Sequence, residues 1–380
     1  MLALSSLRRD AVLRGVAIQV LFLGVLALLV YEAVATGLAN MRAHHIPVDF
    51  SFWREPAGFD IDQHLIPYSP ASTYGRAFLV GLLNTLLVAA IGIVPASLLG
   101  FALGAARLSR NFLVARLAAI YVEATRNVPL LLQLLFWYNA VLEALPSPQR
   151  SLALPGHVYL NDRGLFLPAP VFAPAAVWVL VAFGFGLFGG LACWFWAKRM
   201  DSWRSLAVLP VIAFPLATYF AIGQPLGFDV PVLKGFNFSG GAKLLPEFIA
   251  LLFSLVLYTA AFIAEIVRAG IEGVPKGQGE AASALGLREA EARKYVIIPQ
   301  AMRLIVPPLT SQYLNLFKNS SLAVFIGYPD LIQVFAGTVL NQTGAAVPVM
   351  ATTMAVYLSV SLLTSLLMNL YNRRIAKVQH

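Results

Sequence analysis

Long apolar runs recur along this chain and constrain its fold more than any other feature. A bilayer core about 30 Å thick requires roughly 20 apolar residues per helix. We predict such spans at 14–38, 76–106, 114–143, 174–197, 205–223, 246–269, 301–326 and 347–371. Ten-residue units of alternating polarity, the mark of a membrane barrel, do not occur in the sequence. The sequence therefore predicts an all-α polytopic membrane protein with about eight transmembrane helices.

The composition supports this class and excludes several functions. The chain is 59% hydrophobic and 12% charged, against roughly 45–50% and about 25% in soluble domains. Its single cysteine, Cys193, excludes an internal disulfide and a thiolate metal site. His44, His45 and His64 lack supporting cysteine or carboxylate spacing, so we predict no metal site. We also predict no catalytic residues, because no nucleophile–base pattern is visible.

The net charge of +9 reports topology rather than nucleic-acid binding, because much of the basic excess flanks apolar runs. One set of basic segments comprises the N-terminus, 107–116, 198–204, 270–299 and 373–377. The loops of the other set, 39–75 and 224–245, carry less basic excess. The two sets alternate along the eight spans without conflict. The positive-inside rule therefore predicts that both termini and segment 270–299 face the cytoplasm.

The predicted spans differ in polarity. Spans 174–197 and 205–223 carry almost no polar residue, which predicts packing or lipid contact. The regions 76–143 and 246–326 carry the polar side chains Asn84, Glu123, Arg126, Asn127, Gln133, Glu265, Arg268, Asn315, Lys318 and Asn319. Charge at membrane depth is costly and usually faces a bundle interior or a water-filled path. The chain is therefore expected to divide into a polar working core and apolar additions.

Segment 270–299 is polar inside an otherwise apolar chain, and its pattern predicts a short helix. Pro275 suits the start of a helical turn, where its missing N–H would have no partner. Ala281, Ala282 and Leu285 then fall on one helical face. Gly286 supplies the left-handed residue that ends the helix.

A second, charged turn follows this short helix. Glu289 and Arg293 have the i,i+4 spacing of a helical ion pair, and Pro299 is expected to stop that turn and start the return to the membrane. Small residues on the first helix allow close approach of a partner, and Glu280 is placed to meet a basic group on it. An ordinary amphipathic loop between two spans is the alternative interpretation of the pattern alone.

The residue order in this segment resembles the EAA loop of ABC importer permeases. Glu280-Ala281-Ala282 is followed after three residues by Gly286, and after nine more by Val296-Ile297-Ile298-Pro299. Valine and isoleucine replace the isoleucine and leucine of the family pattern and keep its apolar character. Segments 84–86, 121–131, 275–278, 299–301 and 318–322 also resemble the polar amino-acid (histidine/glutamate/glutamine-type) family, and within it the enlarged Q-type subunit of general L-amino-acid importers.

The resemblance covers roughly 75–143 and 246–375 and implies a type I ABC importer permease core of five spans with three extra spans. Residues 1–74 are then an N-terminal anchoring span with a periplasmic loop, and 75–143 the first part of the core. Residues 144–245 are a two-span insertion with periplasmic loops. Residues 246–375 are the second part of the core and include the cytoplasmic coupling loop 270–299.

The resemblance also implies the function and the partners. The chain would be a permease in the bacterial inner membrane that moves polar or general L-amino acids from periplasm to cytoplasm. Glu280, Ala281, Ala282 and Gly286 would seat in a groove of a cytoplasmic ABC ATPase dimer. A second permease subunit, in a heterodimer, and a periplasmic amino-acid-binding protein complete the assembly. This sequence has no G-x-x-x-x-G-K-[ST] motif, so ATP and Mg²⁺ would be bound, and ATP hydrolysed, by the partner.

The translocation pathway has four candidate residues. Lys318 lies well inside its span beside Asn319, where it would pair with an acidic side chain or attract an α-carboxylate. Glu123 and Arg126 lie nearly one turn apart and suit an ion pair or a gate. An ion-coupled secondary transporter is an alternative function, but it predicts repeated halves, which we do not find. A non-transporting scaffold would leave the ordered motif unexplained.

Overall fold

Helices dominate the computed structural model, which describes residues 11–43, 46–197, 208–223 and 226–377. Its α-helices are α2 (Ala11–Ala43), α3 (Tyr74–Arg107), α4 (Phe112–Asn127), α5 (Leu130–Ala144), α6 (Val177–Ala197), α7 (Val208–Ala221), α8 (Pro246–Glu272), α9 (Lys276–Ala284), α10 (Glu289–Ala292), α11 (Ile298–Asn319), α12 (Leu340–Thr343) and α13 (Ala346–Lys377). The shorter 3₁₀ turns are η1 (Ser51–Arg54), η2 (Pro148–Arg150), η3 (Pro174–Ala176) and η6 (Ser320–Ile326). Two π-helical segments are η5 (Arg293–Ile297) and η7 (Ile332–Val339).

The chain forms two compact units, one of residues 1–122 with 259–380 and one of residues 123–258. These boundaries fall within α4 and α8. The sequence predicts a different division, with an insertion at 144–245. The expected division stays a prediction.

The helical membrane character is clear, but the expected number of spans is not reproduced. Five helices of the described residues are long and apolar enough to cross a membrane: Arg14–Ala43, Tyr74–Arg107, Pro174–Cys193, Pro246–Glu272 and Ala346–Leu370. Two further apolar helices, Leu130–Ala140 and Leu209–Ala221, are shorter. The span expected at 301–326 corresponds to α11 and η6, whose polar and basic side chains lower its hydropathy.

The single span expected at 114–143 is two helices, α4 and α5. The break falls at Pro129, which has an extended backbone and precedes the first residue of α5. A proline disfavours helical geometry in the residue before it, so α4 ends there. Gln133 Nε2 then donates to the carbonyl oxygens of Thr125 at 2.7 Å and Val128 at 2.9 Å, which otherwise lose their helical partners at this break.

The all-α prediction is also wrong for residues 144–245, the segment expected to be an insertion, which carry short strands. They are β1 (Leu152–Leu154), β2 (Val158–Asn161), β3 (Gly164–Leu167), β4 (Ala169–Phe172), β5 (Leu226–Asp229), β6 (Val232–Lys234), β7 (Asn237–Ser239) and β8 (Ala242–Leu244). β1, β2, β3 and β8 form an antiparallel sheet in that order, and β4–β5 and β6–β7 form two separate pairs. Leu165 of β3 lies opposite Leu244 of β8. Strands of three or four residues are too short to show an alternation that a sequence search detects.

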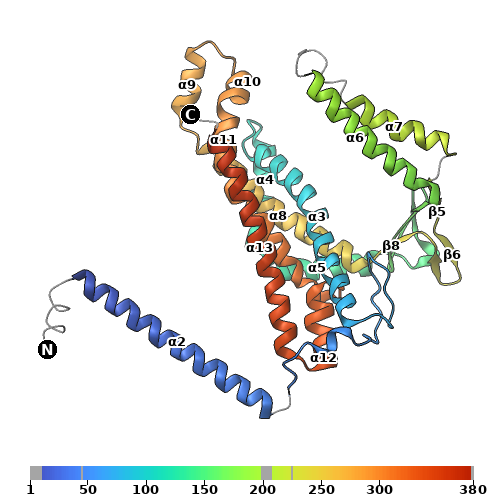
Figure 1. Cartoon of the computed structure of the whole chain (residues 1–380). Coiled ribbons are helices and arrows are strands. Elements are labelled where there is room, and N and C mark those ends of the chain that lie inside the picture. The colour runs from blue at the N-terminus through green and yellow to red at the C-terminus, as the bar shows by residue number, and fades with distance from the viewer. Residues whose placement is uncertain (1–10, 44–45, 198–207, 224–225, 378–380) are drawn as a thin grey trace. The chain divides into compact units, whose positions relative to one another are not determined.

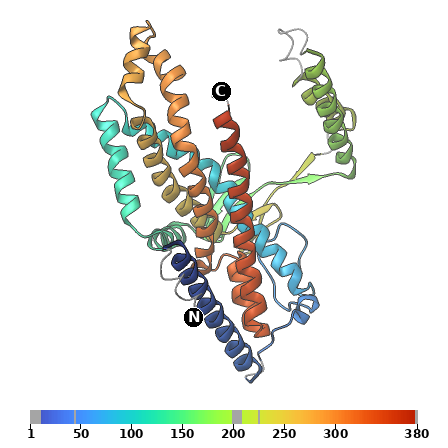
Figure 2. The same ribbon diagram turned by 60° about the vertical axis from the view of Figure 1, so that its left-hand side comes forward.

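Between strands β4 and β5, helices α6 and α7 form an antiparallel hairpin, which is labelled in Figure 1 and seen with its two helices overlapping in Figure 2. They approach closely at Gly186, where a Cβ would lie 2.7 Å from the carbonyl oxygen of Pro210. Most side chains on the outside of α6 are apolar and exposed, among them Leu180, Phe185 and Phe188. This is the kind of surface that lipid covers, as expected from the apolar sequence of the hairpin.

The first unit packs α3 against α8 through small residues. A Cβ at Gly100 would lie 2.6 Å from Cβ of Ile263, and a Cβ at Gly104 would lie 2.7 Å from Cβ of Val267. Two glycines four residues apart let helix backbones approach closely, which suits association in a bilayer. At the end of the same interface Arg107 forms an ion pair with Glu265.

The loop before α3 is packed into the same unit rather than left in solvent. Phe52 is 5% exposed, and its ring lies 6.4 Å from that of Phe335, which also contacts Phe78 at 5.0 Å. Asn84, fully buried in α3, donates from Nδ2 to the carbonyl oxygen of Pro329 at 2.8 Å. Aromatic packing and this hydrogen bond therefore join the loop, α3 and η7 into one core.

Helix α11 departs from one further expectation. Pro299 does not stop the preceding turn, because it occupies the first turn of α11 directly after the π-helical η5. A proline is tolerated in a first turn, where its missing N–H has no helical partner. Two further prolines, Pro307 and Pro308, lie inside the 22-residue α11.

Candidate functional site

The polar segment folds as the sequence predicts, into a short helix that ends at Gly286. Helix α9 begins after Pro275, whose carbonyl oxygen accepts from the backbone N–H of Gln278 at 3.0 Å. At the other end Gly286 has a φ of +81°. Its N–H donates to the carbonyl of Ser283 at 3.0 Å, and that of Leu287 donates to Ala282 at 3.1 Å. This pair of bonds is the Schellman motif, which fixes the end of a helix.

The exposed surface of α9 includes fewer residues than the sequence predicts, because Ala282 is buried. Glu280, Ala281 and Gly286 are exposed, and Leu285 is 83% exposed. Ala282 is only 3% exposed, so it does not share the face of Ala281 and Leu285. Helix α9 packs against η5 and α10, and Leu285 is its C-cap residue, one position beyond the regular helix, so the two side chains have different surroundings. Helix α9 therefore forms a mainly polar protrusion with one exposed apolar side chain, Leu285, beyond the end of α11, as Figure 1 shows for the helices.

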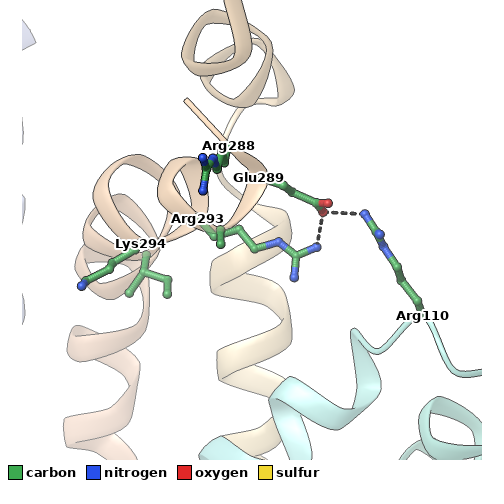
Figure 3. Close-up of a pocket in the computed structure, with 7 residues that line it drawn as sticks. Arg110, Arg288, Glu289, Arg293 and Lys294 are labelled. Atoms are coloured by element: carbon green, nitrogen blue, oxygen red, sulfur yellow. Dashed lines mark hydrogen bonds and ion pairs between the residues drawn. The ribbon is translucent and has the colours of Figure 1, made fainter. Parts of the chain in front are cut away.

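The second turn, α10, carries a three-residue ion-pair cluster (Figure 3). Glu289 Oε1 lies 2.6 Å from Nη2 of Arg293, as the i,i+4 spacing predicts. The same oxygen lies 2.5 Å from Nη2 of Arg110, which belongs to the connection between α3 and α4. The Arg110 guanidinium, assisted by Arg293, lowers the pKa of the Glu289 carboxyl below its ordinary value. Glu289 therefore stays charged and bridges two segments of the first unit.

A cavity of about 630 Å³ lies beside this cluster. Its walls are Arg110, Arg288, Glu289, Ala290, Arg293, Lys294 and Ile298. Four of these seven residues are basic, and the cytoplasmic orientation of this end of the core stays a prediction.

A second ion-pair network lies at the end of α8, directly before α9. Glu265 pairs with Arg268 at 2.5 Å and with Arg107 of α3, and Arg268 also pairs with Glu272. The side chains of Arg107 and Glu265 are 12% and 23% exposed. Partly buried pairs with several hydrogen bonds fix geometry better than exposed pairs do. The network therefore fixes the end of α8 against α3.

Lys318, the first pathway candidate, opens on a cavity of about 460 Å³. The cavity is lined by Lys318, Ser321, Ile332, Met350, Thr353, Met354, Tyr357, Leu358 and Ser361. Ser361 Oγ is buried and has no hydrogen-bond partner within the described residues. No described carboxylate lies within ion-pair distance of Lys318, so the acidic partner considered for it is not found. Asn319 is the last residue of α11 and is half-buried.

The other two pathway candidates, Glu123 and Arg126, lie on α4 three residues apart, and both are outside the buried core. Their role as an ion pair or a gate stays a prediction. Sequence reasoning assigned Arg110 only to the topology signal. Its contact with Glu289 joins positions 179 residues apart, and no pattern in one sequence reports such a pair.

The chain matches known transport proteins over most of its length. Residues 96–377 match the family described as binding-protein-dependent transport system inner membrane component. A putative amino-acid ABC transporter permease protein of Escherichia coli is 50% identical over 350 residues, 90% of this chain and 89% of the relative. A general L-amino acid transport system permease protein of Rhizobium johnstonii is 46% identical over 379 residues, 97% of this chain and 94% of the relative.

Among solved structures, the fold resembles the crystal structure of an amino acid ABC transporter with histidines. The TM-score is 0.50 at 24% identity, and the match covers 79% of this chain and 95% of the other. This likeness supports the fold of an importer permease, which the sequence comparisons support independently. The chain therefore belongs to the family of binding-protein-dependent transport system inner membrane components, among the amino-acid ABC transporter permeases.

Proposed function

We propose that this chain is the permease subunit of an ATP-driven importer of polar or general L-amino acids in a bacterial inner membrane. The observation that carries the proposal is α9, an exposed helix with a fixed C-terminal end, whose residue order resembles the coupling loop of ABC importer permeases. The names of the relatives supply the amino-acid class. The chain itself takes no part in ATP hydrolysis.

Helix α9 is the proposed contact with a cytoplasmic ABC ATPase dimer, which binds ATP and Mg²⁺. Glu280, Ala281 and Gly286 are exposed. They present a carboxylate beside positions with little or no side chain, which suits a groove that contains a basic group. Ala282 is buried and does not contact the ATPase directly in this proposal. Its small side chain lets α9 pack closely within its unit. Leu285 adds an apolar anchor at the end of the helix.

The mechanism follows from a rigid helix attached to a bundle with two arrangements. When the ATPase dimer closes on ATP, the seated α9 moves with it and biases the bundle toward its outward-facing arrangement. Both termini would lie in the cytoplasm, and a periplasmic amino-acid-binding protein would deliver cargo from the other side. A second permease subunit, in a heterodimer, would complete the pathway.

Co-isolation tests this assembly. The full-length chain, tagged and extracted in mild detergent from the organism's own membranes, is expected to co-purify with an ABC ATPase, a second permease and ATPase activity. The genes next to its own are expected to encode these chains and a periplasmic binding protein. Purification without an ATPase, together with an absence of such genes, would refute the importer function.

Lys318 and the cavity beside it are the proposed part of the translocation pathway in this subunit. The exposed ammonium group is not neutralised by a described carboxylate, and hydroxyl groups of Ser321, Thr353 and Ser361 line the same cavity. A cation beside hydroxyl groups suits the α-carboxylate of an amino acid. Asn319 follows directly and would support the site through its amide.

Lys318→Met is expected to raise the substrate concentration for half-maximal import by about tenfold, because a charge-assisted contact of about 1.5 kcal/mol is lost. Import into proteoliposomes with the complete importer and its binding protein measures this effect. Lys243→Met removes an exposed lysine from β8 and serves as the control. Unchanged half-saturation in Lys318→Met would exclude this residue from substrate contact.

A further inference from the structure

The turn between α3 and α4 contacts both flanks of the coupling loop. Arg107, the last residue of α3, pairs with Glu265 of α8, the helix that leads into the loop. Arg110, three residues later, pairs with Glu289 of α10, the turn that leaves it. Helix α9 lies in the chain between these two points of attachment. The α3–α4 turn therefore contacts both α8, which leads into the coupling loop, and α10, which leaves it.

The turn itself is fixed by local hydrogen bonds, which makes it suitable for this role. The N–H of Leu108 donates to the carbonyl of Ala105 at 3.1 Å, which closes the end of α3. Asn111 Oδ1 accepts from the N–H of Leu113 at 2.9 Å and thereby caps the start of α4. Ser109 Oγ accepts from the N–H of Asn111 at 3.2 Å. Arg110 lies between these caps, so its backbone has a defined position.

We propose that Arg110 and Glu289 are positioning residues, which transmit the movement of α9 from the coupling loop to helices α3 and α4. The inference rests on the proposed coupling function of α9. It assigns to the α3–α4 turn a mechanical contact with the coupling loop that lies outside the ATPase-docking motif itself.

The two contacts of the turn have different energetic weight. The side chains of Arg110 and Glu289 are 81% and 57% exposed, and ion pairs as exposed as this contribute little to stability. Loss of this pair would thus leave the fold intact. The Arg107–Glu265 pair is more buried and holds α3 to α8 in any state. The exposed pair can therefore be altered without unfolding the first unit, whereas the buried pair cannot.

Charge reversal tests this link in the complete importer reconstituted in proteoliposomes. Arg110→Glu and Glu289→Arg are each expected to reduce the number of amino acids imported per ATP hydrolysed by about fivefold, at the lower end of typical coupling between sites. The double variant R110E/E289R restores the ratio, because the carboxylate at position 110 then faces the guanidinium at position 289 and that of Arg293. The temperature of unfolding stays within measurement error for all three variants.

Lys294→Glu is the matched control. It makes the same charge change in the wall of the same cavity, and its ammonium group lies over the ring of Tyr295 rather than on Glu289. The number of amino acids that the Lys294→Glu variant imports per ATP hydrolysed is expected to equal that of the wild type.

The outcomes separate this inference from the function on which it rests. A wild-type chain that does not associate with an ATPase contradicts the importer function. If association is intact but either single reversal keeps the wild-type ratio, the positioning role is refuted. Failure of the double variant to recover, or an equal loss in Lys294→Glu, refutes it as well, because the effect then depends on surface charge rather than on the pair.

Discussion

Gly286→Asp is expected to abolish import while the chain still inserts into the membrane. Gly286 has a φ of +81°, and an added Cβ would meet open space. The substitution therefore causes backbone strain of about 1–2 kcal/mol, not a steric clash. It also places a carboxylate beside exposed Leu285, inside the surface proposed to dock. Burial of an unpaired charge there costs about 2–5 kcal/mol, which is more than tenfold in affinity.

Import into proteoliposomes and co-purification of the ATPase measure this loss, and the amount of chain in the membrane fraction reports insertion. Gly156→Asp is the matched control, because Gly156 has a φ of +82°, also faces open space and lies in the insertion. It carries the same strain and the same charge. Wild-type import by Gly286→Asp, or an equal loss in Gly156→Asp, would contradict a docking role for this end of α9.

Gly104→Val is expected to destabilise the first unit more than any surface change. The new Cβ would lie 2.7 Å from Cβ of Val267 and 2.9 Å from the carbonyl oxygen of Ala264. Because backbone cannot move aside like a flexible side chain, α3 has to shift away from α8. Overpacking of this kind costs about 1–3 kcal/mol, which corresponds to a fall of roughly 2–12 °C in Tm. The shift also strains the Arg107–Glu265 pair at the same interface.

Thermal unfolding of the purified chain in detergent measures this effect. Gly24→Val, in the middle of α2, adds the same side chain to a long apolar helix at a position where a Cβ meets nothing within 4 Å. Its Tm is expected to equal that of the wild type. Equal Tm values for both variants and the wild type would show that α3 and α8 do not require close contact at Gly104.

The sequence predicts features that depend on neighbouring residues and misses those that depend on distant ones. The helix end at Gly286 is predictable because a left-handed residue after a helical pattern has few alternatives. The break at Pro129 is predictable by the same logic, yet a continuous apolar run masks it when hydropathy alone is considered. Pro299 misleads in the opposite direction, because a proline can begin a helix as well as end one.

The candidate site is divided in the same way. Glu289 and Arg293 follow from helical spacing, whereas the third member, Arg110, lies 179 residues from its partner. Leu285 is exposed and Ala282 is buried, although helical spacing predicts one face for both, because burial depends on the distant residues that pack against α9. The two glycines at positions 100 and 104 have the spacing of a close helix contact. That spacing is a local signal, which sequence reasoning overlooked.

The order of the four-stranded sheet has a consequence for the helices on either side of it. The chain leaves α5 through β1 and returns to α8 through β8, and these two strands are the edges of the sheet β1–β2–β3–β8. Hydrogen bonds through β2 and β3 therefore fix the distance between the point of departure and the point of return. The segment between β4 and β5 can then change in length without moving the ends of α5 and α8.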